Sequence, residues 1–322
     1  MKLTYRQAWM NGPGPRTWPQ ALMLAAKGFC MGGADIIPGV SGGTIAFITG
    51  IYEDLLRAVR SVNLQAIQAM LRLDFAAVIN HVHLRFLLPL LFGVGTALVG
   101  LAGLMHWLLT EYPVPIWSLF LGLIGASILV VGRKVERWTP GAWGAFGAGA
   151  LAAWFIIGLI PVTTPESWWF IFLCGMIAIC AMILPGISGS FLLLILGKYA
   201  YITGALRNPF GDANLAILAV FACGCIVGLA GFSRLLSWLL GRYHGLTVAM
   251  LTGFMLGAMR KVWPWKETLE SVVIRGKLHV LSERNVLPPT LDSEVLVALG
   301  LMLVGAIVVL GLERLTRGPQ QR

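Results

Sequence analysis

Eight stretches of this chain contain no Asp, Glu, Lys or Arg, and they constrain the fold more than any other feature. They cover residues 36–52, 86–110, 112–132, 138–165, 167–197, 213–233, 243–259 and 295–312. A helix of about 20 apolar residues spans the hydrocarbon core of a bilayer, and most of these stretches reach that length. Only 12% of the 322 residues are charged, too few to cover the surface of a soluble globule of this size. The sequence therefore predicts an all-α polytopic membrane protein.

Two of the uncharged stretches contain a Pro-Gly pair, Pro38-Gly39 in the first and Pro185-Gly186 in the second. Proline removes a helical hydrogen bond and glycine loosens the backbone, so a helix should break at each pair. The pieces that follow, 41–52 and 188–199, would each be about 18 Å long as helix, which is short of a hydrocarbon core of about 30 Å. We interpret both as re-entrant or broken helices.

The two breaks belong to an internal repeat. Residues 28–52 align with 175–199 with ten of 25 positions identical, and residues 93–122 align with 224–253 with nine of 30 identical. Three ordinary spans lie between the breaks, and an odd number of crossings would turn the second half upside down. The sequence thus predicts two inverted-topology repeats, each with one broken helix and three transmembrane helices. The predicted spans lie near 86–109, 115–131 and 141–160, and near 214–239, 246–260 and 295–312.

These signals divide the chain into four parts. They are a cytoplasmic N-terminal segment, 1–17; repeat one, 18–160, with its break at 38–44; repeat two, 161–312, with its break at 185–190; and a cytoplasmic tail, 313–322. Repeat one also contains an extra piece, 54–85, in which apolar residues recur at helical spacing among polar ones. This pattern predicts an amphipathic interfacial helix.

The basic residues predict the orientation, because loops rich in Lys and Arg stay in the cytoplasm. The rule places both termini inside, together with the segment that ends at Arg85 and the loop at 133–137. The loop 261–293 would then lie outside, although it carries five Lys and Arg. The net charge of +10 is not gathered into a nucleic-acid-binding motif, so we expect no nucleic-acid partner. No spacing of the five cysteines indicates a disulfide or metal site, and we expect no cofactor.

Small and hydroxyl residues follow each Pro-Gly pair. Free backbone N–H groups and the positive end of the dipole make a helix start an anion site, and glycine lets a ligand approach the backbone. Two half-helices that enter from opposite faces would then hold one phosphate group. Alternatively, Ser41 and Ser188 are ordinary N-caps and the glycines only permit close packing. The predicted substrate-binding residues are Gly39, Ser41, Gly42, Gly43 and Thr44 in the first break, and Gly186, Ser188, Gly189 and Ser190 in the second.

Two charged residues, Asp35 and Arg234, are expected to lie within the membrane. Asp35 stands three residues before the first break, where an ionisable group is costly enough to suggest a function. We expect Asp35 either to contact substrate or carry a coupling proton, or to hydrogen-bond the unwound backbone. Arg234 lies in the span 214–239, where its guanidinium would bind phosphate oxygens or extend to the membrane surface as a topology anchor.

The first break, from Gly32 to Thr44, and the second, from Ile183 to Ser190, together resemble the bacterial polyprenyl-phosphate transporter family, the PopT-type undecaprenyl-phosphate translocases. The resemblance covers roughly residues 20–312. It implies a flippase in the cytoplasmic membrane that returns undecaprenyl phosphate, the lipid carrier of cell-wall synthesis, to the inner leaflet. Composition and spacing by themselves indicate only an inverted-repeat transporter with an anion site.

The main alternative is an intramembrane enzyme. Undecaprenyl-pyrophosphate phosphatases share a Pro-Gly-x-Ser motif, but theirs continues with an arginine that binds phosphate, and they carry a Glu-x-x-x-Glu pair. This chain has Gly42 in the place of that arginine and no two glutamates at that spacing. We therefore expect no catalytic residues. A small-anion transporter or channel built on re-entrant segments is the third possibility.

Overall fold

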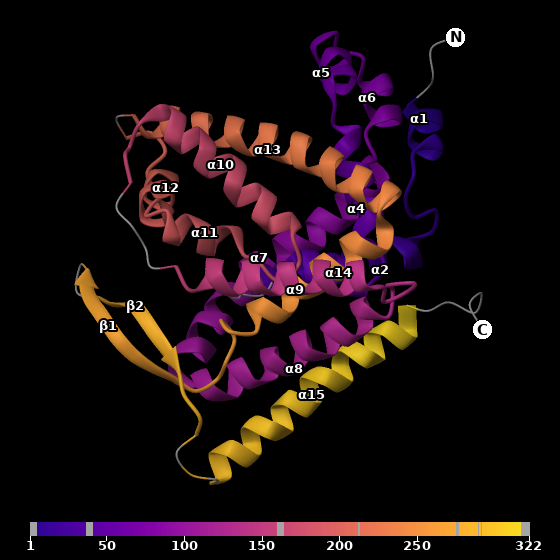
Figure 1. The fold of residues 1–322 in the computed structure, drawn as a ribbon. Helices are drawn as coiled ribbons and strands as arrows, with labels where there is room; N and C mark the ends of the chain where they lie inside the picture. Colours follow the sequence, from indigo (N-terminus) through magenta and orange to yellow (C-terminus); the bar gives the residue numbers. More distant parts are fainter. Residues whose placement is uncertain are drawn as a thin grey trace.

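The computed structural model describes residues 5–36, 41–159, 164–211, 213–274, 277–288, 290 and 292–316. Within these ranges the chain forms fifteen helices and a single antiparallel pair of strands (Figure 1). The elements are α1 (Tyr5–Asn11), α2 (Trp18–Ile36), α3 (Gly42–Ile48), α4 (Tyr52–Ser61), α5 (Leu64–Leu71), α6 (Phe75–His81), α7 (Leu84–Glu111), α8 (Pro113–Gly132), α9 (Pro140–Ile157), α10 (Trp168–Ile183), α11 (Gly189–Ile195), α12 (Tyr199–Arg207), α13 (Asn214–Arg242), α14 (His244–Ala258), β1 (Lys266–Ile274), β2 (Lys277–Asn285) and α15 (Ser293–Thr316).

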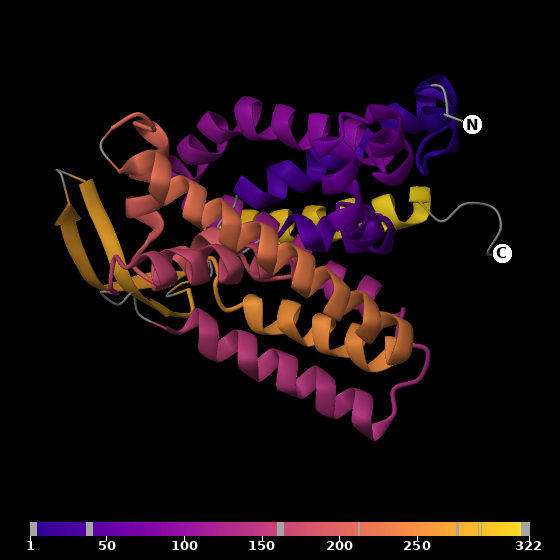
Figure 2. The same cartoon turned by 90° about the horizontal axis from the view of Figure 1, so that it is seen from above.

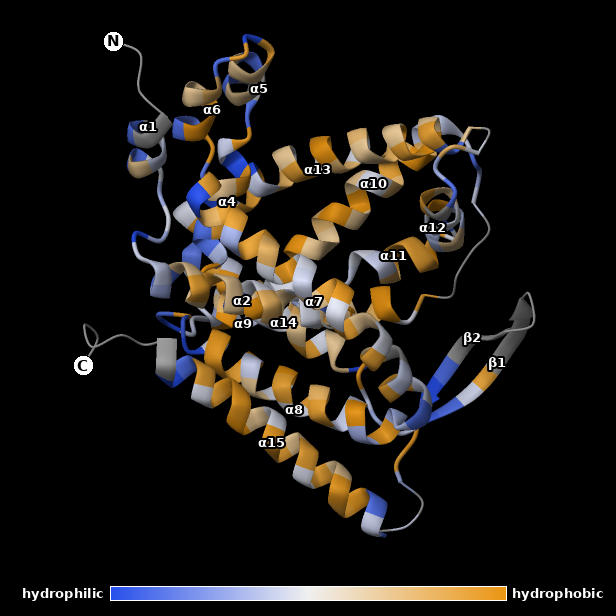
Figure 3. Cartoon of the chain, turned by 180° about the vertical axis from the view of Figure 1, so that it is seen from behind, coloured by the Kyte–Doolittle hydropathy of each residue, from blue (hydrophilic) through white to orange (hydrophobic). Residues whose placement is uncertain are grey.

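Five of the described helices are long and apolar enough to cross a bilayer, namely α7, α8, α9, α13 and α15. Figure 3 shows hydrophobic residues along most of the length of α8, α13 and α15. The five helices confirm a polytopic membrane protein and match five of the six ordinary spans predicted. The sixth, α14, has 15 residues and rises only about 22 Å.

The two halves of the chain form the same set of helix pairs. In the first half α2 packs along α7, and in the second half α10 packs along α13 (Figures 1 and 2). Two other closely packed pairs join the halves: α8 of the first half packs on α15 of the second, and α9 of the first packs on α14 of the second. Each half therefore completes its packing with a helix of the other half, and neither is an independent unit.

The linkers repeat as well as the helices. Tyr112 joins α7 to α8 with φ −131° and ψ 56°, and Tyr243 joins α13 to α14 with φ −134° and ψ 50°. Each tyrosine ring meets the edge of a tryptophan five residues earlier, with ring centroids 5.3 Å apart for Trp107 and 5.9 Å apart for Trp238. Matching torsions and ring contacts at aligned positions support the repeat that the sequence indicates.

Each half contains one insertion that the other lacks. The first half has α5 and α6, so residues 54–85 form several short helices where a single interfacial helix was predicted, with Asn63 and Asp74 as the N-caps that begin α5 and α6. The second half has the β1–β2 hairpin in the basic loop 261–293, which the sequence analysis left without structure. Figures 1 and 2 place this hairpin at the end of the molecule opposite the termini.

Arg85 fixes the N-terminal segment to the helices. Its side chain is 4% exposed and donates hydrogen bonds to the carbonyl oxygens of Trp9, Met10, Gly12 and Pro15. Backbone carbonyls, which carry partial negative charge, solvate the buried guanidinium in place of water. Residues 5–17 are therefore a packed part of the protein, with α1 against α6.

Glycines set the distance between paired helices. A Cβ atom added at Gly122 of α8 would lie 1.9 Å from the carbonyl oxygen of Met302 in α15, and one added at Gly305 would lie 2.3 Å from the carbonyl oxygen of Leu119. The two backbones therefore touch where side chains would hold them apart, as is usual for helix pairs in membranes.

We expect Gly122→Leu to destabilise the protein by about 1–3 kcal/mol or more, because the side chain must push α15 away from α8. The matched control is Gly103→Leu on α7, where an added Cβ atom has nothing within 4 Å. Thermal unfolding of the full chain in detergent checks this. Equal unfolding temperatures for the two variants would contradict the packing described.

Candidate functional site

The two helix breaks lie against each other. The first is bounded by α2 and α3 and the second by α10 and α11. Pro38 and the predicted site residue Gly39 lie outside the described residues. Each half-helix has seven residues where twelve were predicted, because Gly50 and Gly197, aligned in the repeat, turn the chain with φ of +73° and +65°.

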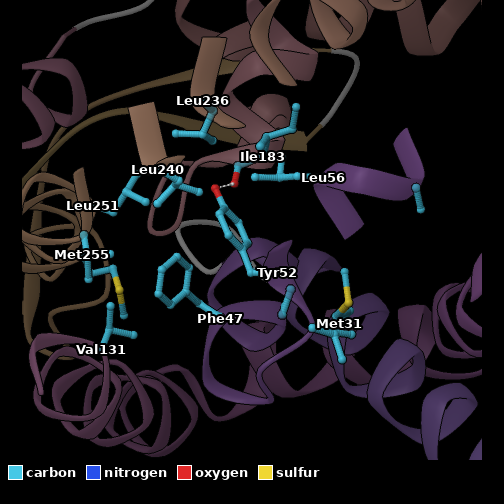
Figure 4. Close-up of a cluster of buried hydrophobic side chains, with 14 of the residues drawn as sticks. Met31, Phe47, Tyr52, Leu56, Val131, Ile183, Leu236, Leu240, Leu251 and Met255 are labelled. Atoms are coloured by element: carbon cyan, nitrogen blue, oxygen red, sulfur yellow. Dashed lines mark hydrogen bonds between the residues drawn. The ribbon is translucent and has the colours of Figure 1, made fainter. Parts of the chain in front are cut away.

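Three hydrogen bonds join the first break and the start of α4 to the second break and the end of α10. Ser41 Oγ donates to the carbonyl oxygen of Met182 at 3.3 Å, and the backbone N–H of Gly186 donates to Thr44 Oγ1 at 3.2 Å. Tyr52, at the start of α4, donates its hydroxyl to the carbonyl oxygen of Ile183 at 3.0 Å (Figure 4). The two breaks are thus in direct contact, and the three side chains that make these bonds, Ser41, Thr44 and Tyr52, are all buried.

The start of α3 is occupied by the chain's own carboxylate. Asp35 Oδ1 accepts a hydrogen bond of 2.7 Å from the backbone N–H of Gly42, and Ser41 Oγ accepts one of 3.1 Å from that of Gly43. A Cβ atom at Gly42 would lie 2.5 Å from Asp35 Oδ2, so glycine is required for this approach. The structure therefore shows the contact of Asp35 with the unwound backbone, at a place where a phosphate oxygen was predicted.

The start of α11 is different. Met182 stands at the repeat position of Asp35, and a Cβ atom at Gly189 would lie 2.7 Å from its Cγ. Ser188 makes no side-chain capping hydrogen bond, and its hydroxyl lies 2.8 Å from that of Ser190. The two half-helix starts are therefore chemically unequal: an anionic side chain caps α3, and among the described residues none caps α11.

Two lysines bind the other end of α3. Lys27 Nζ donates to the carbonyl oxygen of Thr49 at 2.9 Å, and Lys134 Nζ donates to that of Phe47 at 2.7 Å. Cations at a helix C-terminus are favourable because carbonyl groups there lack helical partners and carry partial negative charge. The sequence analysis missed this role, since the lysines are far apart in the chain and neither lies in a motif.

Arg234 does not reach the breaks through any hydrogen bond or ion pair among the described residues. Its side chain is exposed on α13, and its Nη1 donates to the carbonyl oxygen of Ala230, one turn earlier in the same helix, at 2.7 Å. Its role as a phosphate ligand stays a prediction.

A further charged cluster lies at the base of the hairpin. Lys261 Nζ and Lys266 Nζ each lie 3.4 Å from Glu283 Oε2. Lys261 Nζ also lies 5.2 Å from the centroid of the Phe191 ring, and Lys266 Nζ lies 4.3 Å from that of the Trp117 ring. Phe191 belongs to α11, so the cluster adjoins the second half-helix. One acid faces two cations, which leaves the cluster net positive.

The titration of this cluster follows from its burial. Burial lowers the pKa of Lys266 to about 8, Glu283 opposes that shift, and Lys261 adds to it. Burial raises the pKa of Glu283, but the two ammonium groups outweigh burial and hold the pKa below its ordinary value. Lys266 therefore loses its proton as the pH rises through about 8, while Glu283 stays ionised.

We expect Glu283→Gln to move the pKa of Lys266 further below 8 and Lys261→Gln to move it upward, since the first removes an attraction and the second a repulsion. NMR titration of methyl-labelled lysines in the full-length protein measures this pKa. Glu267→Gln, on the exposed residue next to Lys266, is the control and should leave the pKa unchanged. An unaltered Lys266 titration in the Glu283 variant would show that the pair is not formed.

Within the described ranges, no three His, Cys, Asp or Glu side chains gather as metal ligands would.

Comparison with known proteins shows a clear similarity. Residues 31–278 match the family model described as undecaprenyl phosphate translocase-like. The chain is 45% identical to a polyprenyl-phosphate transporter of Vibrio cholerae over 295 residues, which cover 89% of this chain and 94% of that protein. It is 30% identical to a polyprenyl-phosphate transporter of Staphylococcus aureus over 253 residues, covering 74% of this chain and 84% of the relative. No solved structure matches.

Proposed function

The chain belongs to the undecaprenyl phosphate translocase-like family, and on that premise we propose that it moves polyprenyl phosphate from one leaflet of a bilayer to the other. The observation that carries this proposal is the contact between the two helix breaks, joined by Thr44 and Gly186. In transporters built from repeats, the substrate site lies where broken helices of the two halves meet.

We propose that the phosphate binds first at the start of α11. Ser188 and Ser190 offer hydroxyl groups there, Gly189 adds backbone N–H close to the ligand, and no acid stands at the position of Met182 to repel an anion. The start of α3 is the second part of the site and is closed while Asp35 holds the Gly42 N–H. The site therefore has two proposed states. In one, Asp35 occupies the Gly42 N–H at the start of α3, and in the other that N–H is free to bind the phosphate.

Asp35 is the proposed carrier of a coupling proton. An ionised Asp35 carboxylate accepts a strong hydrogen bond from the Gly42 N–H at the start of α3 and repels a phosphate dianion. A protonated Asp35 accepts a weaker hydrogen bond and carries no charge to repel the phosphate. Proton and lipid would therefore enter together from outside. Loss of the proton to the cytoplasm would restore the Asp35–Gly42 bond and expel the headgroup there.

The proposed setting is the cytoplasmic membrane of a bacterium, with both termini inside. The placement of the hairpin opposite the termini supports an outer position for β1 and β2 (Figure 2). Figure 1 also places α4 toward the termini and α12 toward the hairpin, which is what inverted repeats require.

Transport by the full-length protein in proteoliposomes tests this function, with undecaprenyl phosphate on one leaflet and a pH gradient that can be imposed or collapsed. Wild-type protein should flip the lipid faster when the donor side is acidic. Asp35→Asn should still bind the lipid but transport it equally with and without the gradient, because asparagine mimics only the neutral acid. Glu111→Gln, an exposed acid at the end of α7, is the control.

An Asp35→Asn variant that responds to the gradient as wild type does would remove Asp35 from the coupling. Absence of flipping by wild-type protein, with release of inorganic phosphate from undecaprenyl pyrophosphate, would favour the phosphatase instead. A valine at Gly42 or Gly189 is a poor probe of phosphate binding, because its Cβ would meet Asp35 Oδ2 at 2.5 Å or the Ala178 carbonyl oxygen at 2.4 Å.

A further inference from the structure

An apolar cavity lies where α9, α14 and the base of the hairpin meet. Its volume is about 560 Å³, within the range of about 300–1,000 Å³ that is typical of small-molecule sites. Several of its apolar lining side chains are exposed, as those of a lipid-facing surface would be, including Leu151 and Trp154 of α9. Leu256 of α14, Trp263, and Leu287 after β2 also line it.

One cation, Arg260, lines this cavity. Its guanidinium carbon lies 4.7 Å from the centroid of the Trp154 ring, and its Nη1 donates to the carbonyl oxygen of Trp154 at 3.2 Å. Gly158 leaves room for it, since a Cβ atom there would lie 2.6 Å from Nη1. No described acid forms an ion pair with Arg260, so its charge is not neutralised within that part of the chain.

The loop that carries Arg260 is held in place. Asn285 Nδ2 donates to the carbonyl oxygen of Arg260 at 2.9 Å, and Trp263 Nε1 donates to that of Val286 at 2.8 Å. These two bonds attach the segment after α14 to the end of β2 and the residue that follows it, and all four residues line the cavity. The arginine and the apolar walls are therefore arranged before any ligand arrives, which lowers the cost of binding.

An apolar cavity open toward lipid with one unneutralised arginine suits an amphiphile with a long apolar chain and an anionic head. We propose that this cavity receives the lipid substrate at the hairpin end of the protein, with isoprenoid units against Leu151, Leu256 and Leu287 and the phosphate on Arg260. This inference rests on the proposed function, because it takes the transported polyprenyl phosphate as its occupant. Guanidinium groups bind phosphate oxygens in pairs, whereas an ammonium acts as a point charge.

The cavity at the other end of the molecule provides a contrast. It has a volume of about 500 Å³ and is lined in part by Arg57, Asp54 and His83. There the arginine is already paired with Asp54, so an anion would have to displace a carboxylate. The two cavities thus differ, because Arg260 has no described acidic partner whereas Arg57 is paired with Asp54.

Binding of undecaprenyl phosphate to the full-length protein in detergent tests the proposal, with Trp154 and Trp263 as fluorescent reporters in the cavity wall. We expect Arg260→Gln to raise the Kd about tenfold or more, because it removes strong charge-assisted hydrogen bonds. Arg260→Lys should keep part of the affinity. Arg284→Gln, an exposed arginine on the same hairpin that does not line the cavity, is the matched control and should bind as wild type.

Undecaprenol, which lacks the phosphate, should bind wild type and Arg260→Gln alike, and Leu256→Trp should weaken both lipids by filling the cavity. Wild-type affinity in Arg260→Gln would overturn the proposal, and so would equal competition by phosphatidylglycerol, which would make this a general site for anionic lipid. Proteoliposomes separate this inference from the proposed function. If wild-type protein transports the lipid and Arg260→Gln transports it equally well at low lipid concentration, the cavity proposal is wrong but the proposed function stands. If wild-type protein does not transport the lipid, the proposed function is wrong.

Discussion

The structure depends on one constraint, which is that backbone polar groups freed at a helix break need partners where water is scarce. Side chains of the first half supply these partners at both breaks, since Asp35 and Ser41 accept the N–H groups of Gly42 and Gly43 at the first break. Thr44 accepts the N–H of Gly186, Ser41 reaches the carbonyl oxygen of Met182, and Tyr52 reaches that of Ile183. Without these side chains the second break would leave such groups unpaired at a cost of several kcal/mol, so the first half is what makes the second break tolerable.

This dependence of the second break on the first half requires the two halves to interlock. The α8–α15 and α9–α14 pairs bind each half to the other, which keeps the breaks in register. Against this shared scaffold the differences between the halves stand out: Asp35 in one and Met182 in the other, short helices in one and a hairpin in the other. These differences make the two half-helix starts chemically unequal, whereas a symmetric site would be the same from both faces.

The sequence predicts well what depends on local pattern and poorly what depends on distant contacts. Apolar length located five of the spans, and the Pro-Gly pairs located both breaks. The turns at Gly50 and Gly197 that shorten the half-helices require left-handed backbone, which apolar pattern does not reveal. The hydrogen bond from Lys134 Nζ to the carbonyl oxygen of Phe47 joins residues 87 positions apart in the chain. The position of Arg260 is fixed by its hydrogen bonds with Trp154 and Asn285. Such partners have no signature in one sequence.

The central claim is that the two halves enter the membrane in opposite directions so that their breaks meet. Single cysteines at Glu53 and Ala200 test it most directly, because these exposed residues are aligned in the repeat and follow the two half-helices. In a variant otherwise free of cysteine, a membrane-impermeant thiol reagent applied to intact and to inverted vesicles should label them from opposite faces. Labelling of both positions from one face would contradict the account.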